Sequence, residues 1–353
     1  MRVRADGLVR VFRGPPERRA LDGLDADFAE GDVHAVIGPN GSGKTTLLRI
    51  LALLDRPDAG CVLFDGVPVR PCREDRRRAT MAFDRAALLR GTVRWNLRFA
   101  LRAHGVPRAD AEARIAEWIE PLALGRILDS RVDRISAGEA RRAAMARAFS
   151  LRTELLLLDE PTANLDPPSA SLIESAVRSV AAAGRSTVVL ATHDLTMARD
   201  LAGRVHFLAD GRIRQGGTAG EVFDSPGSRQ LAEFVGLENV FRGVVEMRGD
   251  RQVFVGPGIE FVVATERAGP AFAGISAREI LLSREAVRSS AMNSVGGTIA
   301  SIERRGPLVL VTVRGAATLT ASITPATLAS MAFFVGEEIL LTFKATSVRL
   351  FDA

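Results

Sequence analysis

The stretch GPNGSGKTT, residues 38–46, decides the fold of this chain. It follows the apolar run DVHAVI at 32–37 and precedes LLRIL, so the local order is strand, glycine-rich turn and helix. In such a turn the backbone N–H groups converge on phosphate oxygens, and the helix points its positive end at them. The pattern predicts an α/β protein with a P-loop that holds a nucleoside triphosphate.

Each position of this loop has an expected role. Lys44 reaches the β- and γ-phosphates, and the hydroxyl of Thr45 serves Mg²⁺. Lys44 and Lys344 are the two lysines of a chain that otherwise uses arginine, so the ammonium at 44 indicates a point-charge role. The residues expected to bind ATP here are Gly38, Pro39, Asn40, Gly41, Ser42, Gly43, Lys44, Thr45 and Thr46.

Two later apolar runs end in polar residues suited to ATP hydrolysis. ELLLLDEP at 154–161 predicts a central strand, after which Asp159 holds Mg²⁺ and Glu160 orients or deprotonates the attacking water. STVVLATHDL at 186–195 predicts another strand, ending in His193, whose side chain faces the γ-phosphate. Lys44, Glu160 and His193 are therefore the expected catalytic residues.

A helical subdomain is expected at about 85–150. GTVRWNLRFALRAHG and PRADAEARIAEWIEPLAL are typical of short amphipathic helices with Gly and Pro breaks. RISAGEARRAAMARAF at 134–149 predicts a further helix with Ser136 as N-cap and Glu139 completing a capping box. The charged run REDRRR at 73–78 is interpreted as a solvated face or turn.

These motifs together resemble those of ABC-type ATPases, over residues 1 to about 235. The matching positions are Phe12 for the aromatic that stacks on adenine, Ser136, Ala137, Gly138 and Glu139 for the signature turn, Asp166 for the D-loop, and His193 for the switch histidine. The resemblance implies a head-to-tail homodimer. Each ATP then lies between the 38–46 loop of one subunit and Ser136 and Gly138 of the other.

Two positions depart from the family pattern. Asp84 stands where the family usually has Gln, in the loop that senses Mg²⁺ and contacts the membrane partner. Its carboxylate can approach Mg²⁺ but also repels the γ-phosphate. Ala137 stands where the signature usually has Gly, which adds a methyl group and restricts φ. A working enzyme and a weakly hydrolysing ATP sensor are both open at this point.

The chain changes composition near residue 236. From there it shows short β runs with Gly and Pro turns, which predict a small all-β, OB-like barrel at 236–353. Asn239 and Gly243 recur as Asn293 and Gly297, and SAREILLS and FKATSVRL occupy comparable later positions, so two copies of one β unit are expected.

This second region resembles the regulatory TOBE/mop barrel of importer ATPases, most closely the molybdate/tungstate type. By resemblance, Ser290, Lys344 and Ser347 are oxyanion candidates, whereas Met292 stands where the family often has a basic residue. A purely structural or dimerising barrel remains the alternative.

Composition narrows the setting of the protein. The chain has 353 residues, a net charge of +5 and scattered arginines, so we expect two domains and no nucleic-acid partner. No apolar run approaches the roughly 18 residues that cross a bilayer. Cys61 and Cys72 are interpreted as structural thiols.

A transporter is favoured over repair and translation machines, because no heptads are sustained and the chain carries one ATPase half. We therefore expect the ATPase subunit of a tungstate or molybdate importer, at the cytoplasmic face of the plasma membrane. Its expected partners are a separate permease and a periplasmic or extracellular solute-binding protein. The alternatives are a sulfate, polyamine, sugar or iron importer, or the ATP sensor. Leu88, Leu89, Val93, Trp95 and Leu97 form either a groove for the permease or the core of the helical subdomain.

Overall fold

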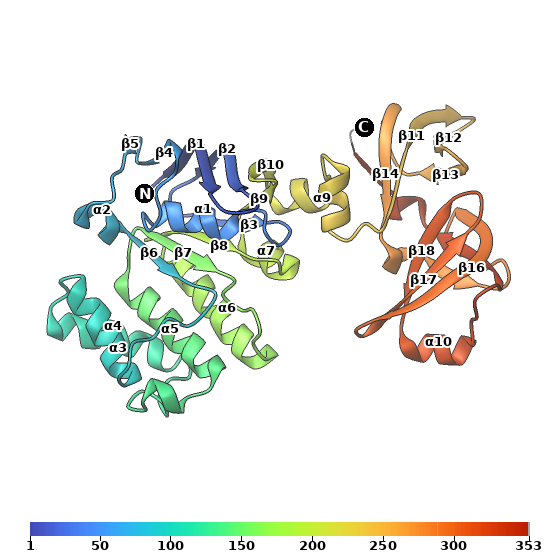
Figure 1. Ribbon diagram of the computed structural model, residues 1–353. Coiled ribbons are helices and arrows are strands. Elements are labelled where there is room, and N and C mark those ends of the chain that lie inside the picture. The colour runs from blue at the N-terminus through green and yellow to red at the C-terminus, as the bar shows by residue number, and fades with distance from the viewer. Residues whose placement is uncertain (288, 352–353) are drawn as a thin grey trace. The chain divides into compact units, whose positions relative to one another are not determined.

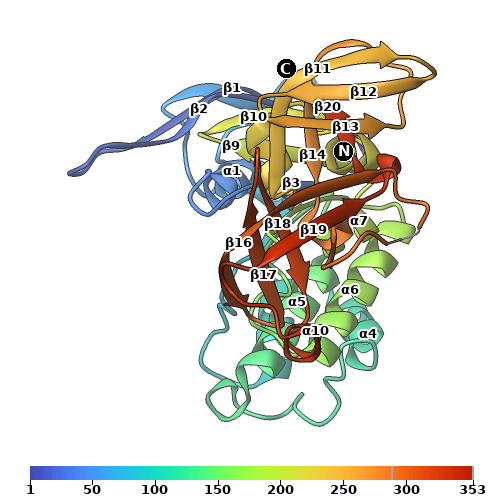
Figure 2. The same ribbon diagram turned by 90° about the vertical axis from the view of Figure 1, so that its right-hand side faces the viewer.

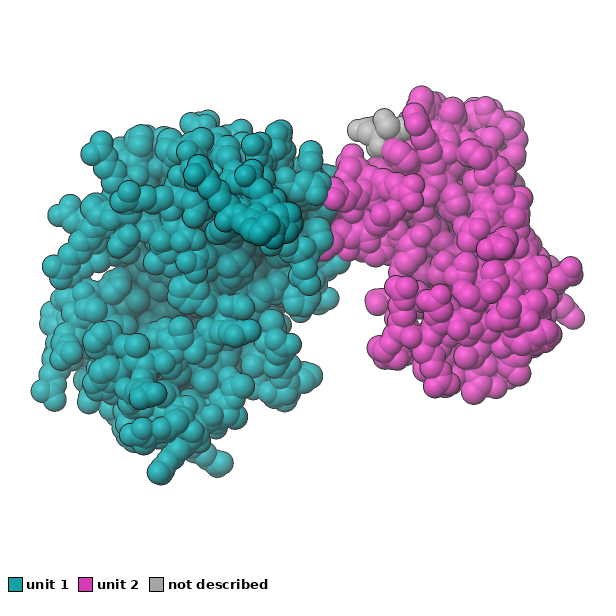
Figure 3. Space-filling view, in the orientation of Figure 1, with its two compact units in different colours: residues 1–222 teal, residues 223–353 magenta. Residues whose placement is uncertain are grey.

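The chain forms two compact units, Met1–Val222 and Phe223–Ala353, in a computed structural model that describes residues 1–287 and 289–351 (Figure 3). The division falls before the position at which composition changes. Residues 223–235 belong to the second unit because Ala232, on α9 (Arg229–Phe234), packs against Leu237 and Phe351. α8 (Ala219–Phe223) ends at the division.

A six-stranded sheet organises the first unit (Figure 1). Its order is β10-β9-β3-β8-β7-β6, and β10 alone runs antiparallel to its neighbour. The strands are β3 (Val33–Ile37), β6 (Ala79–Ala82), β7 (Leu155–Asp159), β8 (Thr187–Ala191), β9 (Arg204–Ala209) and β10 (Arg212–Gly217). β3, β7 and β8 are buried throughout, which explains their continuous apolar runs.

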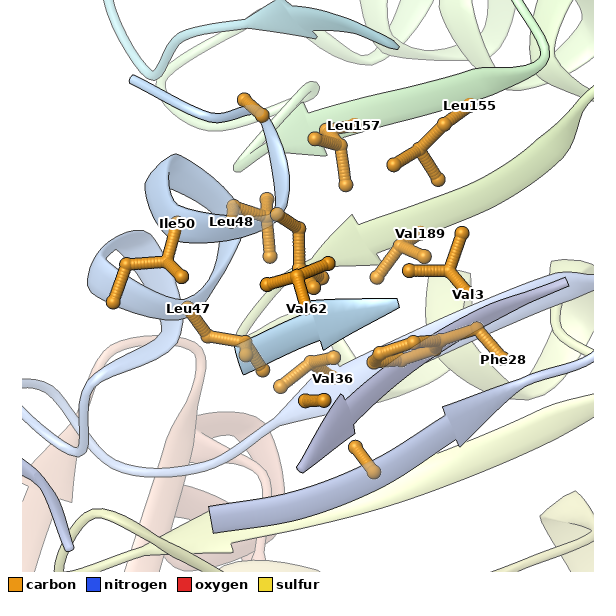
Figure 4. Packing of buried hydrophobic residues seen from close by; sticks show 14 of the residues in the cluster. Val3, Phe28, Val36, Leu47, Leu48, Ile50, Val62, Leu155, Leu157 and Val189 are labelled. Carbon is orange, nitrogen blue, oxygen red and sulfur yellow. The ribbon is translucent and has the colours of Figure 1, made fainter. Parts of the chain in front are cut away.

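A second, antiparallel sheet of the first unit has the order β2-β1-β4-β5. Its strands are β1 (Val3–Phe12), β2 (Arg18–Phe28), β4 (Ala59–Phe64) and β5 (Val67–Pro68). The helix α1 (Lys44–Leu51) packs with both sheets in one core, whose members include Leu47 and Leu48 of the helix and Val3, Phe28 and Leu157 of the strands (Figure 4). This burial anchors the helix that follows the P-loop.

The remaining helices of the first unit follow α1 along the chain, and several of them lie within the range of about 85–150. They are α2 (Arg73–Arg78), α3 (Val93–Ala103), α4 (Arg108–Ile119), the 3₁₀ turn η1 (Val132–Arg134), α5 (Ala137–Leu151), α6 (Pro167–Ala182) and α7 (Leu195–Leu201). The run 73–78 is solvated, as interpreted, but it forms a short helix that buries none of its residues. α5 begins with the predicted capping box between Ser136 and Glu139.

The second unit consists of two five-stranded antiparallel sheets, with the orders β13-β12-β11-β14-β20 and β18-β17-β16-β19-β15 (Figure 2). The elements are β11 (Asn239–Arg248), β12 (Arg251–Gly256), β13 (Ile259–Val263), β14 (Gly269–Ile275), η2 (Ala277–Glu279), β15 (Leu281–Ser283), β16 (Asn293–Arg305), β17 (Leu308–Arg314), β18 (Thr318–Ile323), α10 (Pro325–Met331), β19 (Glu338–Phe343), η3 (Ala345–Ser347) and β20 (Arg349–Phe351).

The two sheets repeat one design, which confirms the internal repeat. In the chain order of each copy, four strands are followed by a 3₁₀ turn and a last short strand. The second copy differs by the helix α10 between its third and fourth strands. That last strand is exchanged: β15 of the first copy pairs with β19, and β20 of the second copy pairs with β14. Each copy therefore completes the sheet of the other, and one continuous core joins them.

The repeated asparagines tie the two sheets together. Asn239 donates from Nδ2 to the Thr320 carbonyl (2.9 Å) and accepts from the Thr320 N–H (2.6 Å). Asn293 makes the same pair of bonds with Val262, at 3.0 and 2.7 Å. Both asparagines are buried, and each reaches the sheet of the other copy. The repeated asparagines therefore make two equivalent contacts, one from each copy to the other, which we call the asparagine clamp.

No helix among the described residues has the length and apolarity needed to cross a membrane.

Candidate functional site

The carboxyl ends of neighbouring parallel strands create the pocket. β3 runs into the P-loop, β6 ends two residues before Asp84, and β7 ends at Asp159, beside Glu160. Such strand ends meet at one edge of a parallel sheet, which is where ligands of open α/β folds bind. The pocket of about 320 Å³ is lined by Arg18, Asn40, Gly41, Gly43, Lys44, Thr45, Thr46, Asp84, Asp159 and Glu160.

The P-loop backbone has a shape that side chains would disrupt. Gly38, Gly41 and Gly43 have φ of 153°, 83° and 113°. A Cβ at Gly43 would lie 2.3 Å from the Ala20 carbonyl oxygen, so only glycine fits there. Gly43 caps α1 without a side-chain hydrogen bond, and the first turn holds no acid. The helix N-terminus is thus suited to a phosphate.

Lys44 lies against its own loop. It is only 7% exposed, and its Nζ donates to the carbonyls of Gly38 (2.7 Å) and Pro39 (3.1 Å). Burial lowers the pKa of Lys44, against the opposing fields of Glu160 and Asp159. The ammonium is therefore placed at the loop with weak solvation, which strengthens its interaction with an incoming anion.

Asp159 has a free buried acceptor. The residue is 1% exposed, and burial raises its pKa, partly opposed by a hydrogen bond with Thr45. Within the described residues, Asp159 Oδ2 has no hydrogen-bond partner, and neither has the buried Ser42 Oγ. Carboxylate and hydroxyl oxygens are the ligands that Mg²⁺ takes beside nucleotide phosphates. The residues present therefore fit a Mg²⁺–nucleotide ligand.

Glu160 and His193 form a pair. Glu160 Oε2 lies 2.8 Å from His193 Nδ1, and the His193 N–H donates to the same oxygen at 3.4 Å. The Glu160 N–H donates to the Ala191 carbonyl (2.8 Å), which ties the end of β7 to the end of β8. The strand ends at Ala191 and not at His193, so the prediction of its end was wrong by two residues. The histidine lies in the turn beyond, with a mostly exposed side chain.

The other expected ATP contacts do not line this pocket. Phe12 is exposed at the end of β1, under the Arg10 guanidinium. Ser136 and Ala137 are exposed at the start of α5, and the Glu139 carboxylate accepts from the Ser136 N–H (2.8 Å). Asp166 caps α6 by accepting from the Ser169 N–H at 3.3 Å. These contacts within the chain explain the local structure without a ligand.

Ala137 fits its position without backbone strain. It is the first residue of α5, where its backbone is helical, so alanine costs nothing that glycine would avoid. Its exposed methyl group faces away from the core of the chain.

The oxyanion candidates of the second unit are not buried. Ser290 and Lys344 are exposed and Ser347 is half-buried. Lys344 and Ser347 lie on one turn, since the Ser347 N–H donates to the Lys344 carbonyl (3.0 Å) at η3. Met292 is also exposed.

Two arginines at the site were missed in the sequence. Arg18, which pairs with Phe12 across the β1–β2 ladder, donates to the Gly41 carbonyl at 2.6 Å and lines the pocket. Arg141 is 4% exposed and donates to the carbonyls of Phe83 and Glu160. In a chain with so many arginines nothing marks either one, although Arg141 lies on the face of α5 that holds Ala144, Met145 and Ala148.

Two family models match the chain, one described as ABC transporter over residues 21–163 and one as TOBE domain over residues 289–350. Similar proteins include the molybdate/tungstate import ATP-binding protein WtpC of Pyrococcus abyssi, 31% identical over 94% of this chain and 96% of the relative. Its Pyrococcus horikoshii counterpart is 33% identical over 93% and 94%. The sulfate/thiosulfate import ATP-binding protein CysA of Caulobacter vibrioides is 38% identical over 64% and 68%.

Solved structures agree with this placement. The ATP-binding cassette MJ0796, in a dimeric post-hydrolysis state bound to ADP and Pi, matches with a TM-score of 0.57 and 26% identity, over 62% of this chain and 98% of that one. The predicted fold, a P-loop ABC ATPase followed by an all-β TOBE-type domain, is confirmed. The chain belongs to the family of ATP-binding subunits of ABC transporters, which are ATPases.

Proposed function

We propose that this chain powers the import of molybdate or tungstate through a separate membrane permease. The observation that carries the substrate class is coverage. The molybdate/tungstate relatives match over 93–94% of the chain, so they include the second unit. The sulfate relative is more identical, but it matches over only 64%. The match across both units of the chain therefore favours the molybdate class.

For hydrolysis we assign roles to the pocket residues. Lys44 and the P-loop N–H groups bind the phosphates, and Asp159 with Thr45 holds Mg²⁺ beside Asp84. When bound, Mg²⁺ neutralises charge on the β- and γ-phosphate oxygens. Glu160 accepts the proton of the attacking water. His193 Nδ1 lies 2.8 Å from the Glu160 carboxylate and orients that carboxylate.

The remaining candidates serve a second subunit in this proposal. Ser136, Ala137 and Gly138 start a helix whose first residues are exposed, and they lie outside the pocket of their own chain. In a head-to-tail homodimer they reach the γ-phosphate of the partner's ATP, with Asp166 between the two sites and Phe12 against the adenine. The dimeric state of the similar cassette MJ0796 supports the formation of a dimer.

A permease docks, in this proposal, on the exposed aromatic patch of the helical subdomain at the cytoplasmic membrane face. Trp95 and Phe99 stack with ring centroids 5.1 Å apart and are both exposed, as is Leu89. Val93 and Leu97 are fully buried and belong to the subdomain core. Of the five residues that the sequence suggested, Leu89 and Trp95 therefore belong to the exposed patch, and Phe99 joins them.

Uptake in cells tests the transport role. The gene for this chain is deleted, and molybdenum, tungsten and sulfur uptake are measured by mass spectrometry. The proposal expects loss of molybdate and tungstate uptake, with sulfate uptake retained. Wild-type chain restores uptake, whereas Glu160→Gln does not. If molybdate and tungstate uptake is retained and sulfate uptake is lost, the chain belongs instead to a sulfate importer.

A turnover assay separates a motor from an ATP sensor. Full-length chain is compared with its Asp84→Gln variant for hydrolysis of Mg·ATP. Clear turnover of the wild type, with little gain in the variant, supports the motor. A wild type that binds ATP but hydrolyses it only after the substitution would support the sensor.

A further inference from the structure

Arg141 is a buried cation that lies behind the nucleotide pocket. Its Nη1 donates to the carbonyl of Phe83 at 2.5 Å, and its Nη2 donates to the carbonyl of Glu160 at 2.6 Å. The residue is 4% exposed. One guanidinium therefore joins the residue before Asp84 to the residue that we assign as the base.

The electric fields of three carboxylates act on this cation. Burial lowers the pKa of Arg141, and the fields of Asp84, Asp159 and Glu160, in that order, oppose the shift. Lys44 also interacts with Asp159 and Glu160. The three carboxylates and Lys44 together carry a formal charge of −2. Arg141 brings the formal charge of the cluster to −1. That difference matters because the ligand of the pocket is itself a polyanion.

A second arginine of the same helix gives a comparison. Arg147 Nη1 donates to the carbonyl of Ala87 at 2.7 Å, so it also fastens the segment that follows β6. The pKa of Arg147 is lowered by burial alone, with no contribution from an acidic group. Arg147 therefore shows that an arginine of α5 can hold this segment through a carbonyl without interacting with the carboxylates. Arg141 does both.

We propose that Arg141 is a positioning residue of the ATPase centre, which holds the Asp84 and Glu160 segments together and offsets the charge of Asp84. This role explains how an acidic residue can stand at position 84 beside the γ-phosphate. It rests on the hydrolytic function proposed above. It predicts an energetic coupling between Arg141 and Asp84 that simple packing of α5 does not produce.

Full-length variants test this coupling. Arg141→Gln removes the charge, Arg141→Lys keeps the charge but cannot bridge both carbonyls, and Asp84→Asn removes the opposing charge at equal size. We expect Arg141→Gln to lower kcat about 100-fold, at the lower end of the range for one preorganised electrostatic contact, and to weaken Mg·ATP binding more than ADP binding. Arg141→Lys recovers part of the ATP-over-ADP preference, and Arg147→Gln stays within about threefold of wild type.

The decisive measurement is Asp84→Asn in the Arg141→Gln background. We expect at least about a tenfold gain in kcat over Arg141→Gln alone, whereas Asp84→Asn in the wild type gives no gain. Additive effects, or an unchanged kcat in Arg141→Gln, overturn the proposal. The ratio of ATP to ADP affinity needs no turnover, so it tests the charge role even if wild-type hydrolysis is undetectable. Hydrolysis by wild type but not by Glu160→Gln tests the proposed function separately, and melting curves identify misfolded variants.

Discussion

The nucleotide pocket of the first unit and the oxyanion candidates of the second were both suggested by short sequence patterns, yet they differ in the structure. The pocket gathers residues from four segments around a buried carboxylate oxygen that has no protein partner among the described residues. In the second unit, Ser290 and Lys344 are exposed. The residues that repeat most regularly there, Asn239 and Asn293, make hydrogen bonds that stabilise the fold. The repeated residues of the second unit thus serve the fold, whereas the motif residues of the first unit come together at one pocket.

The largest expected effect tests the pocket side of this comparison. Glu160→Gln removes the proposed base while keeping the shape of the side chain, so kcat for ATP hydrolysis should fall about 10²- to 10⁴-fold. Glu154→Gln is the matched control, because Glu154 precedes the opposite end of β7 and pairs with Arg78 at the surface. Phosphate release under Mg·ATP saturation gives both rates. Equal rates for the two variants would remove Glu160 from the mechanism.

The asparagine clamp gives the next largest effect, on stability. Asn293→Ala leaves the Val262 N–H and carbonyl without their side-chain partners in a buried position, which should cost about 2–3 kcal/mol in the free energy of unfolding. Asn239→Ala should cost a similar amount through Thr320. The neighbouring exposed Ser294→Ala should stay within about 0.5 kcal/mol. Urea denaturation followed by circular dichroism measures all three, and a neutral Asn293→Ala would contradict the clamp.

A buried histidine pair predicts acid sensitivity in the first unit. His34 Nδ1 and His206 Nε2 lie 3.2 Å apart beside Phe28, and burial lowers both pKa values, that of His206 to about 4. Since the unfolded chain binds these protons near its ordinary pKa and the folded chain does not, stability is full above about pH 6.5 and falls as the pH drops towards 4. The slope should reach about 1.4 kcal/mol per pH unit for each histidine.

Urea midpoints measured between pH 7.5 and 5 check this dependence. His206→Phe should flatten the curve, because it removes the histidine whose pKa burial lowers to about 4. A parallel acid curve for His206→Phe and wild type would assign the sensitivity to other groups.

The smallest effect tests the weaker side of the comparison. Lys344 is exposed, so Lys344→Ala should change stability by less than about 0.5 kcal/mol. Calorimetric titration of the full-length chain with molybdate, tungstate and sulfate checks its ligand role. If the oxyanion site is there, the substitution weakens molybdate and tungstate binding about tenfold, as loss of one charged contact does. Absence of binding to the wild type would leave the second unit with an architectural role.

Local sequence chemistry predicted most of the first unit. The P-loop, the Asp159–Glu160 strand end and the Ser136 capping box are contiguous patterns, so they could be found without a structure. Arg18, Arg141 and the His34–His206 pair could not, because their roles come from residues far apart in the chain. The repeat announced two copies in the second unit but not their exchanged strands, since pairing partners are a property of the sheet.

The exchange of β15 and β20 has a consequence for how the protein is made. The sheet built on β11 lacks its edge strand until Arg349–Phe351 has been synthesised, and β15 stays unpaired until β19 follows it. On the ribosome, the first unit can fold while the second still exposes open sheet edges. Acquisition of the all-β structure therefore waits until β20 has been synthesised, and a chain truncated before Arg349 would carry the first unit attached to an unfinished sheet.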